Sequence, residues 1–174
     1  MTKAELIKLI EDSFDGVEQP QDLTLHVAEA HDGYDYDHDD EHRRKDFFGR
    51  WQDVPSEDIQ NCQTALSYLD KVGMRYYLPA YMVWYLKNCE KTNAVLGDHT
   101  LYSLDNHPND PKLAEYHRER FSLFDEDQMN ACSQFVKFCA EDETGFTDSD
   151  FARKKFERYW SQYERNQEST FNSD

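Results

Sequence analysis

The chain has 174 residues, which is enough for one domain with a hydrophobic core and short for two independent ones. It carries 36 acidic and 19 basic side chains, and because a net charge of −17 repels phosphates and anionic surfaces, we expect no nucleic acid and no membrane as partners. No two of its six glycines lie closer than the sixteen residues from Gly33 to Gly49, which excludes a glycine-rich nucleotide-binding loop and a hydrolase nucleophile elbow.

The N-terminal part of the chain predicts two helices followed by an acidic segment. Thr2 and Glu5 have the spacing of a capping box, and apolar residues follow them at helical intervals until Gly16. A second short helix is expected over residues 22–31. Residues 32–46 contain no aliphatic side chain, so they predict a long acidic loop or an exposed helical extension.

The middle of the chain predicts two further helices. Apolar residues recur every three or four positions from Ile59, which indicates a helix over residues 56–73 that ends near Gly73. Because proline is tolerated only in the first turn of a helix, Pro79 predicts that the next helix begins near Leu78 and runs to about residue 90. This stretch is apolar on nearly all faces and should be the central buried helix.

The C-terminal half predicts a long connection and then three helices. Glycine, asparagine and proline residues indicate a connection over residues 93–110, with an extended piece over residues 100–104. Asp110 should open the first of the three helices, Asp125 should begin a capping box for the second, and Asp148 should cap the last.

Strand-like alternation is nearly absent, so the sequence predicts an all-α fold, a single compact bundle of about six helices with a long acidic loop. Residues 1–167 should form this one domain, and residues 168–174 should be a frayed C-terminal tail. Aromatic residues make up 14% of the chain, so large flat side chains should dominate the core.

The cysteines and the N-terminus both indicate a cytoplasmic protein. The four cysteines form no C-x-x-C pair and lie in apolar segments, so they should be buried reduced thiols, at Cys62, Cys89, Cys132 and Cys139. The first residues contain no apolar run of signal-peptide length, and no window approaches the ~20 apolar residues of a membrane span.

One string matches a catalytic pattern. His38, Glu41 and His42 satisfy H-x-x-E-H, in which two imidazoles one helical turn apart bind Zn²⁺ and the glutamate polarises a water. Charged residues surround the string and no third ligand stands out, so the sequence assigns no catalytic residue, no metal ligand and no cofactor. A metal-dependent enzyme built on this cluster stays an alternative hypothesis.

The residues that we expect to bind a partner form an acidic strip between positions 32 and 41. Its carboxylates repel one another, which costs stability, and its two tyrosines supply the rigid contact area that interface hot spots favour. The acidic strip comprises Asp32, Tyr34, Asp35, Tyr36, Asp37, Asp39, Asp40 and Glu41. A solvated loop that only keeps the chain soluble is the alternative interpretation.

Several stretches together resemble a known family. They are Gly49-Arg50-Trp51, the string Tyr-Tyr-Leu-Pro-Ala-Tyr-Met at residues 76–82, Phe121-Ser122 shortly before Gln128, and Tyr159-Trp160. In this order and spacing they resemble a bacterial domain family of unknown function, over about residues 5–163. The resemblance implies a compact domain in a bacterial cytoplasm and assigns no role to any residue.

Three functional hypotheses follow. The first is a protein-binding domain for a basic protein, since small acidic cytoplasmic domains resemble the immunity proteins that bacteria pair with secreted toxins. The second is a mimic of DNA that occupies the groove of a DNA-binding enzyme. The third is the metal-dependent enzyme described above. The sequence does not indicate an oligomeric state.

Overall fold

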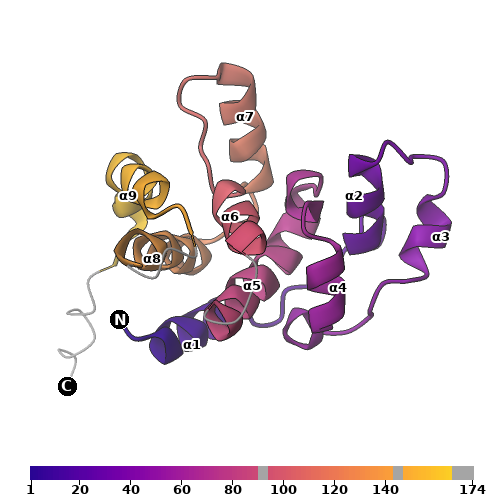
Figure 1. The fold of residues 1–174 in the computed structure, drawn as a ribbon, viewed down its shortest axis with the longest axis horizontal. Helices are drawn as coiled ribbons and strands as arrows, with labels where there is room; N and C mark the ends of the chain where they lie inside the picture. Colours follow the sequence, from indigo (N-terminus) through magenta and orange to yellow (C-terminus); the bar gives the residue numbers. More distant parts are fainter. Residues whose placement is uncertain (90–93, 143–146, 166–174) are drawn as a thin grey trace.

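The computed structural model describes residues 1–89, 94–142 and 147–165, and within them it is helical with no strand (Figure 1). The α-helices are α1 (Lys3–Ser13), α2 (Leu25–Asp32), α3 (Asp39–Arg43), α4 (Ser56–Asn61), α5 (Lys71–Asn88), α6 (Ala94–Tyr102), α7 (Pro111–Arg120), α8 (Glu126–Glu141) and α9 (Ser149–Arg158). Three short 3-10 helices are η1 (Trp51–Asp53), η2 (Ala65–Ser67) and η3 (Trp160–Tyr163).

The all-α prediction is confirmed, although the expected number of helices was wrong. The described ranges hold nine α-helices where about six were expected, because segments predicted as one helix or as a connection form separate short helices. None of the helices in these ranges is long and apolar enough to span a membrane. The expected tail over residues 168–174 lies outside the described residues.

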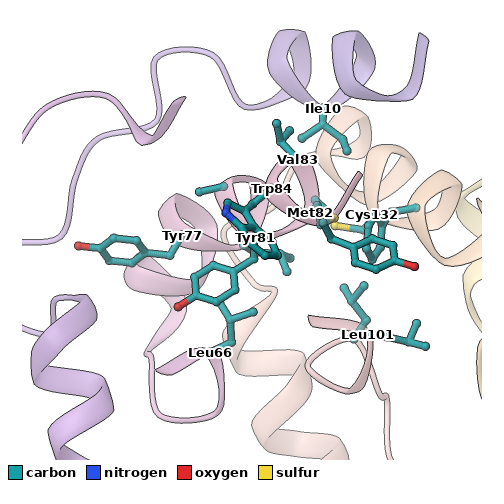
Figure 2. Packing of buried hydrophobic residues seen from close by; sticks show 14 of the residues in the cluster. Ile10, Leu66, Tyr77, Tyr81, Met82, Val83, Trp84, Leu101 and Cys132 are labelled. Atoms are coloured by element: carbon teal, nitrogen blue, oxygen red, sulfur yellow. The ribbon is translucent and has the colours of Figure 1, made fainter. Parts of the chain in front are cut away.

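Helix α5 is the central helix of the fold, as predicted. It runs through the middle of the molecule, with α2 and α3 toward one end and α8 and α9 toward the other (Figure 1). Residues 76–86 are all buried. Side chains from α1, η2, α6 and α8 surround α5 in Figure 2, among them Ile10, Leu66, Leu101 and Cys132. The buried cluster therefore joins elements from both ends of the chain.

The tyrosines of α5 tie this helix to three separate segments. The hydroxyl of Tyr76 donates to the carbonyl of Gly49 at 2.9 Å, and that of Tyr81 donates to the carbonyl of Cys62. The Tyr85 hydroxyl lies 3.2 Å from Asp142 Oδ2. These bonds satisfy hydroxyl groups that are otherwise buried with the aromatic rings.

The start of α5 differs from the prediction. Asp70 caps the helix by accepting from the backbone N–H groups of Val72 and Gly73, so α5 begins seven residues before Leu78 at Lys71. Pro79 lies in the helix interior, where a proline removes one backbone hydrogen bond and costs roughly 3 kcal/mol. Burial of the surrounding apolar side chains offsets this cost.

The predicted helix over residues 56–73 is interrupted. Helix α4 ends at Asn61, and the backbone N–H of Thr64 donates to the Glu29 carboxylate at 3.0 Å instead of continuing the helix. Gly73, which was expected to end a helix, lies inside α5. A Cβ at this position would come within 2.7 Å of Leu69 Cδ2 and 3.3 Å of the Leu23 carbonyl oxygen. This glycine marks close packing.

The predicted connection over residues 93–110 was also wrong in its first part. Residues Ala94–Tyr102 form α6, which buries Leu96 and Leu101 against the core. A Cβ on Gly97 would lie 2.7 Å from the ring of Tyr85, so this glycine lets α6 approach α5 closely. The extended piece expected over residues 100–104 is absent from the described structure.

The capping predictions are confirmed. Capping boxes form at Thr2 and at Asp125, and the carboxylates of Asp110 and Asp148 accept backbone N–H groups at the starts of α7 and α9. The four cysteines are buried and free, also as predicted, and burial raises the pKa of the Cys62 thiol to about 12. These side chains therefore behave as small apolar residues in the core.

Candidate protein-interaction site

The acidic strip lies at the outer edge of the molecule, where α2 turns into α3, at the opposite end from α9 (Figure 1). Asp32 is the last residue of α2, the next six positions form the turn, and three strip carboxylates occupy α3. The prediction of a long acidic loop is corrected to a turn and a short helix. Acidic residues at the start of a helix are stabilised by its dipole, which is a local reason for the helix to begin there.

Asp35 is the centre of the strip because two histidines bond the same carboxylate. Its Oδ1 lies 2.7 Å from His38 Nδ1 and its Oδ2 lies 2.9 Å from His42 Nε2. These bonds lower the pKa of Asp35 to about 2, the His42 bond contributing most. In return Asp35 raises the pKa of His38. The arrangement fixes the turn against the first residues of α3.

Two further side chains, His31 and Arg43, connect α3 to α2 and to the segment before it. His31 Nε2 of α2 lies 2.9 Å from Asp39 Oδ1 of α3, and the ring of His31 also packs on that of Tyr36 with centroids 4.7 Å apart. Arg43 pairs with Asp40 at 2.5 Å and donates to the carbonyl of Asp22 before α2. The strip is therefore held in place by contacts on both sides.

Helix α2, the turn and α3 form a helical hairpin, and Asp46 anchors the end of this hairpin that follows α3. Thr24 at the start of α2 makes no side-chain capping bond, and Asp46 Oδ1 instead accepts from the backbone N–H of His26 at 3.0 Å. The same oxygen lies 3.0 Å from His26 Nδ1, and this bond raises the pKa of His26. Asp46 is buried, so a residue predicted as loop is a structural cap for a helix twenty residues earlier.

Residues far away in sequence support the strip, and the sequence analysis did not predict them. The Tyr68 hydroxyl donates to Asp32 Oδ1 at 2.5 Å, and the Thr64 hydroxyl donates to Asp32 Oδ2 at 3.0 Å. The bond to Asp32 raises the pKa of Tyr68 to about 12. Nothing in the local sequence of either residue points to Asp32, since the contact depends on how η2 packs beside α2.

Asp37 and Glu41 are the strip residues whose carboxylates face solvent without a partner. Both residues are exposed, and within the described ranges neither carboxylate forms a hydrogen bond or an ion pair. The remaining four strip carboxylates each bond at least one other side chain. Asp37 and Glu41 are therefore the carboxylates that can pair with an incoming cation at the lowest cost.

Tyr34 combines high exposure with an unfavourable backbone conformation. Its side chain is 84% exposed and its φ is +61°, in the left-handed region that costs a non-glycine residue roughly 1–2 kcal/mol. The backbone N–H groups of Tyr34 and Asp35 donate to the carbonyls of His31 and Ala30, a helix-ending motif whose left-handed position favours glycine. The neighbouring glycine, Gly33, does not occupy that position.

The alternative metal cluster does not assemble in this geometry. His38 and His42 both turn to Asp35, and Glu41 does not join them. Across the ranges given above, no group of three or more histidine, cysteine, aspartate or glutamate side chains is placed to hold a metal ion. The histidines thus bind carboxylates of the strip itself.

Comparison with known proteins identifies the family. The sequence profile of a family of unknown function, DUF6714, matches residues 2–164. The chain belongs to this family. The match begins at the cap of α1 and ends directly after η3, so the acidic strip of this DUF6714 protein lies inside the matched region. The resemblance inferred from sequence motifs is confirmed at the level of an uncharacterised family. No curated protein and no solved structure matches the chain.

Proposed function

We propose that this DUF6714 protein is a cytoplasmic protein-binding domain whose acidic strip takes a basic partner protein, in the manner of an immunity protein that neutralises a toxin. The observation that carries the proposal is Tyr34. An exposed aromatic ring in a backbone position that favours glycine lowers stability and buries nothing. Such local cost is typical of a residue retained for contact with another molecule.

The charge distribution supports a basic partner. Residues 1–60 hold 17 acidic and 6 basic side chains, so much of the net charge of −17 lies in the part of the chain that contains the strip. Such a field accelerates encounter with a positively charged protein and disfavours acidic ones. Asp37 and Glu41 supply unpaired carboxylates beside Tyr34 and Tyr36, which are 84% and 56% exposed in the same order.

The fixed geometry of the hairpin supports tight binding. The bonds of Asp35 to His38 and His42 hold the turn in one conformation before a partner arrives. A surface that is already ordered loses less conformational entropy on binding, so more of the contact energy appears as affinity. This is the property expected of an inhibitor that covers the active site of a toxin.

The test is a capture experiment with matched charge variants. The tagged wild-type chain is compared with D37N/E41Q, which removes the two unpaired strip carboxylates, and with E115Q/E119Q, which removes two exposed carboxylates of α7. Both variants change the net charge equally. Captured proteins are identified by mass spectrometry, purified, and titrated against each chain at about 50 mM and about 500 mM salt, since screening separates electrostatic from apolar binding.

We expect the wild type and E115Q/E119Q to bind a basic protein with similar affinity at low salt. D37N/E41Q should bind about tenfold more weakly, and Y34A should weaken binding at both salt concentrations because its ring contact is not screened. Equal binding by D37N/E41Q and the wild type, or a captured protein that is acidic, contradicts the proposed function.

A further inference from the structure

A hollow on the side of α5 shares no residue with the acidic strip and has a different chemistry. It has a volume of about 380 Å³, which falls within the usual size of small-molecule sites. Residues of η1, α4 and α5 form most of its lining, which consists of Trp51, Gln52, Val54, Ser56, Ile59, Ala80, Val83, Trp84, Lys87 and Asn88. Its walls expose polar and apolar surface in nearly equal amounts, and two indole rings contribute to them.

Hydrogen bonds fix both indole rings. Trp51 Nε1 donates to the carbonyl of Phe14 at 2.8 Å, and Trp84 Nε1 donates to the hydroxyl oxygen of Ser56 at 2.7 Å. Trp84 also appears among the packed side chains of α5 in Figure 2. Because these rings are held in place, the hollow exists before any ligand enters. Trp51 is 2% and Trp84 is 8% exposed, so a flat aromatic molecule would pack on the small part of each ring that faces the hollow.

The polar groups of the hollow favour an anion. Lys87 is the one charged side chain in the lining, and no carboxylate belongs to it, although the chain has 36 acidic residues. Three other hollows on the described surface are each lined by a carboxylate, from Asp15 and Glu18 in two cases and from Glu141 in the third. The ion pair of Lys87 with Glu11 is loose, at 3.7 Å, and the Lys87 side chain stays half-exposed.

Ser56 adds a hydrogen-bond donor. Its hydroxyl oxygen accepts from Trp84 Nε1 at 2.7 Å and from Gln60 Nε2 at 3.1 Å. A serine hydroxyl has two acceptor positions and one hydrogen, so these two bonds leave the hydrogen for an acceptor outside the protein. The lining therefore offers a cation and a hydroxyl donor together with the two indole rings.

We infer that this hollow binds a small molecule with a flat aromatic body and a carboxylate. The aromatic body packs on the indole-lined wall and the carboxylate accepts from the ammonium of Lys87. This inference stands on residues that the acidic strip does not share, so it is independent of the proposed protein-binding function.

The test uses 1-naphthoate, its neutral amide 1-naphthamide, and 1-naphthylmethylammonium as probes. They share one ring system and differ in the charge at one position. Each is titrated into ¹⁵N-labelled protein while the indole N–H signals of the three tryptophans are followed by NMR. Trp160 is the internal control, since it is fully buried and its Nε1 donates to the carbonyl of Leu104 at 2.9 Å.

We expect 1-naphthoate to shift the signals of Trp51 and Trp84 and to leave that of Trp160 in place. A ligand of this size, bound with ordinary efficiency for each non-hydrogen atom, has a dissociation constant on the order of 1 mM. The amide should bind about threefold to tenfold more weakly, because it lacks the charge that Lys87 attracts, and the ammonium probe more weakly still.

K87Q should reduce the affinity for 1-naphthoate to that of the amide and leave the affinity for the amide unchanged. K112Q on α7 is the matched control and should bind 1-naphthoate as the wild type does. A80L fills the hollow and should abolish the shifts of all three probes, its fold being checked by the unchanged Trp160 signal. Equal affinity for the three probes, an effect of K112Q equal to that of K87Q, or no shift of Trp51 and Trp84 at several millimolar probe overturns the inference.

Discussion

His117 of α7 is a buried histidine whose protonation should make the fold sensitive to acid. Its side chain is 2% exposed and stacks on Phe121 with ring centroids 4.4 Å apart. Neither ring nitrogen has a hydrogen-bond partner among the described residues. Burial first, and then the nearby charge of Arg120, lower the pKa of His117 to about 4. The folded protein therefore keeps this ring neutral in mild acid.

The loss of stability in acid follows from the difference in proton binding by His117 between the folded and unfolded states. In the unfolded chain the ring takes a proton below its ordinary pKa of 6.5, whereas in the folded chain it does so only near 4. Between these values the unfolded state binds more protons, so stability is complete above pH 6.5 and falls as the pH drops toward 4. At 1.36 kcal/mol for each pKa unit, the full loss is roughly 3 kcal/mol, and about 2.5 kcal/mol of it has occurred by pH 4.5.

H117F isolates this contribution. Phenylalanine fits the same stack and loses no hydrogen bond, but it cannot take a proton. We expect urea unfolding to give a similar free energy for H117F and the wild type at pH 7.5, and a value for H117F about 2.5 kcal/mol higher than the wild type at pH 4.5. Other titrating groups cancel because both proteins carry them.

F121L is the control, since it disturbs the same stack and removes no titrating group. It should lower the free energy of unfolding by a similar amount at both pH values. If the difference between H117F and the wild type is the same at pH 7.5 and pH 4.5, then His117 is protonated in the folded state without cost, and the reasoning from burial is wrong.

Three further predictions concern the strip, its anchor and the thiols. Y34G should be about 1 kcal/mol more stable to urea than Y34A, because both lose the ring and only glycine fits the left-handed backbone, and equal stability would show that the position is unstrained. D46A should lower the free energy of unfolding by about 2 kcal/mol at neutral pH, since it leaves the start of α2 and the ring of His26 without an acceptor, and a change below ~0.5 kcal/mol would contradict that role. A thiol reagent at pH 8 should not label the native protein and should label four cysteines in denaturant, because Cys62 and the others are buried; fast native labelling of any of them would refute this.

Local signals in the sequence predicted those features that depend on neighbouring residues. The capping boxes at Thr2 and Asp125 are set by residues three positions apart, so they could be read directly. The existence of α6 depends on packing between distant segments, as Gly97 illustrates by its close approach to the Tyr85 ring. No local pattern distinguishes a glycine that ends a helix from one that lets two helices approach.

The candidate site was predictable in composition and not in geometry. The acidic residues and tyrosines of the strip are evident in the sequence, but their bonds to His31, Tyr68 and Thr64 are not. The two histidines that suggested zinc ligands, His38 and His42, instead bond Asp35, which precedes them by three and seven residues. The left-handed backbone of Tyr34 was equally hidden, because Gly33 beside it is the residue that the sequence would place there.

Three tyrosine hydroxyls of α5 fix the rotation of a helix that is buried on nearly all sides. A helix with one apolar stripe has a preferred rotation about its axis, whereas α5 is apolar nearly all round and gains almost the same burial at many rotations. Tyr76, Tyr81 and Tyr85 each reach a different acceptor, at Gly49, Cys62 and Asp142. Rotating or sliding α5 by one residue breaks all three bonds at once. These polar contacts therefore select a single rotation and register of a helix that is otherwise apolar on nearly all sides.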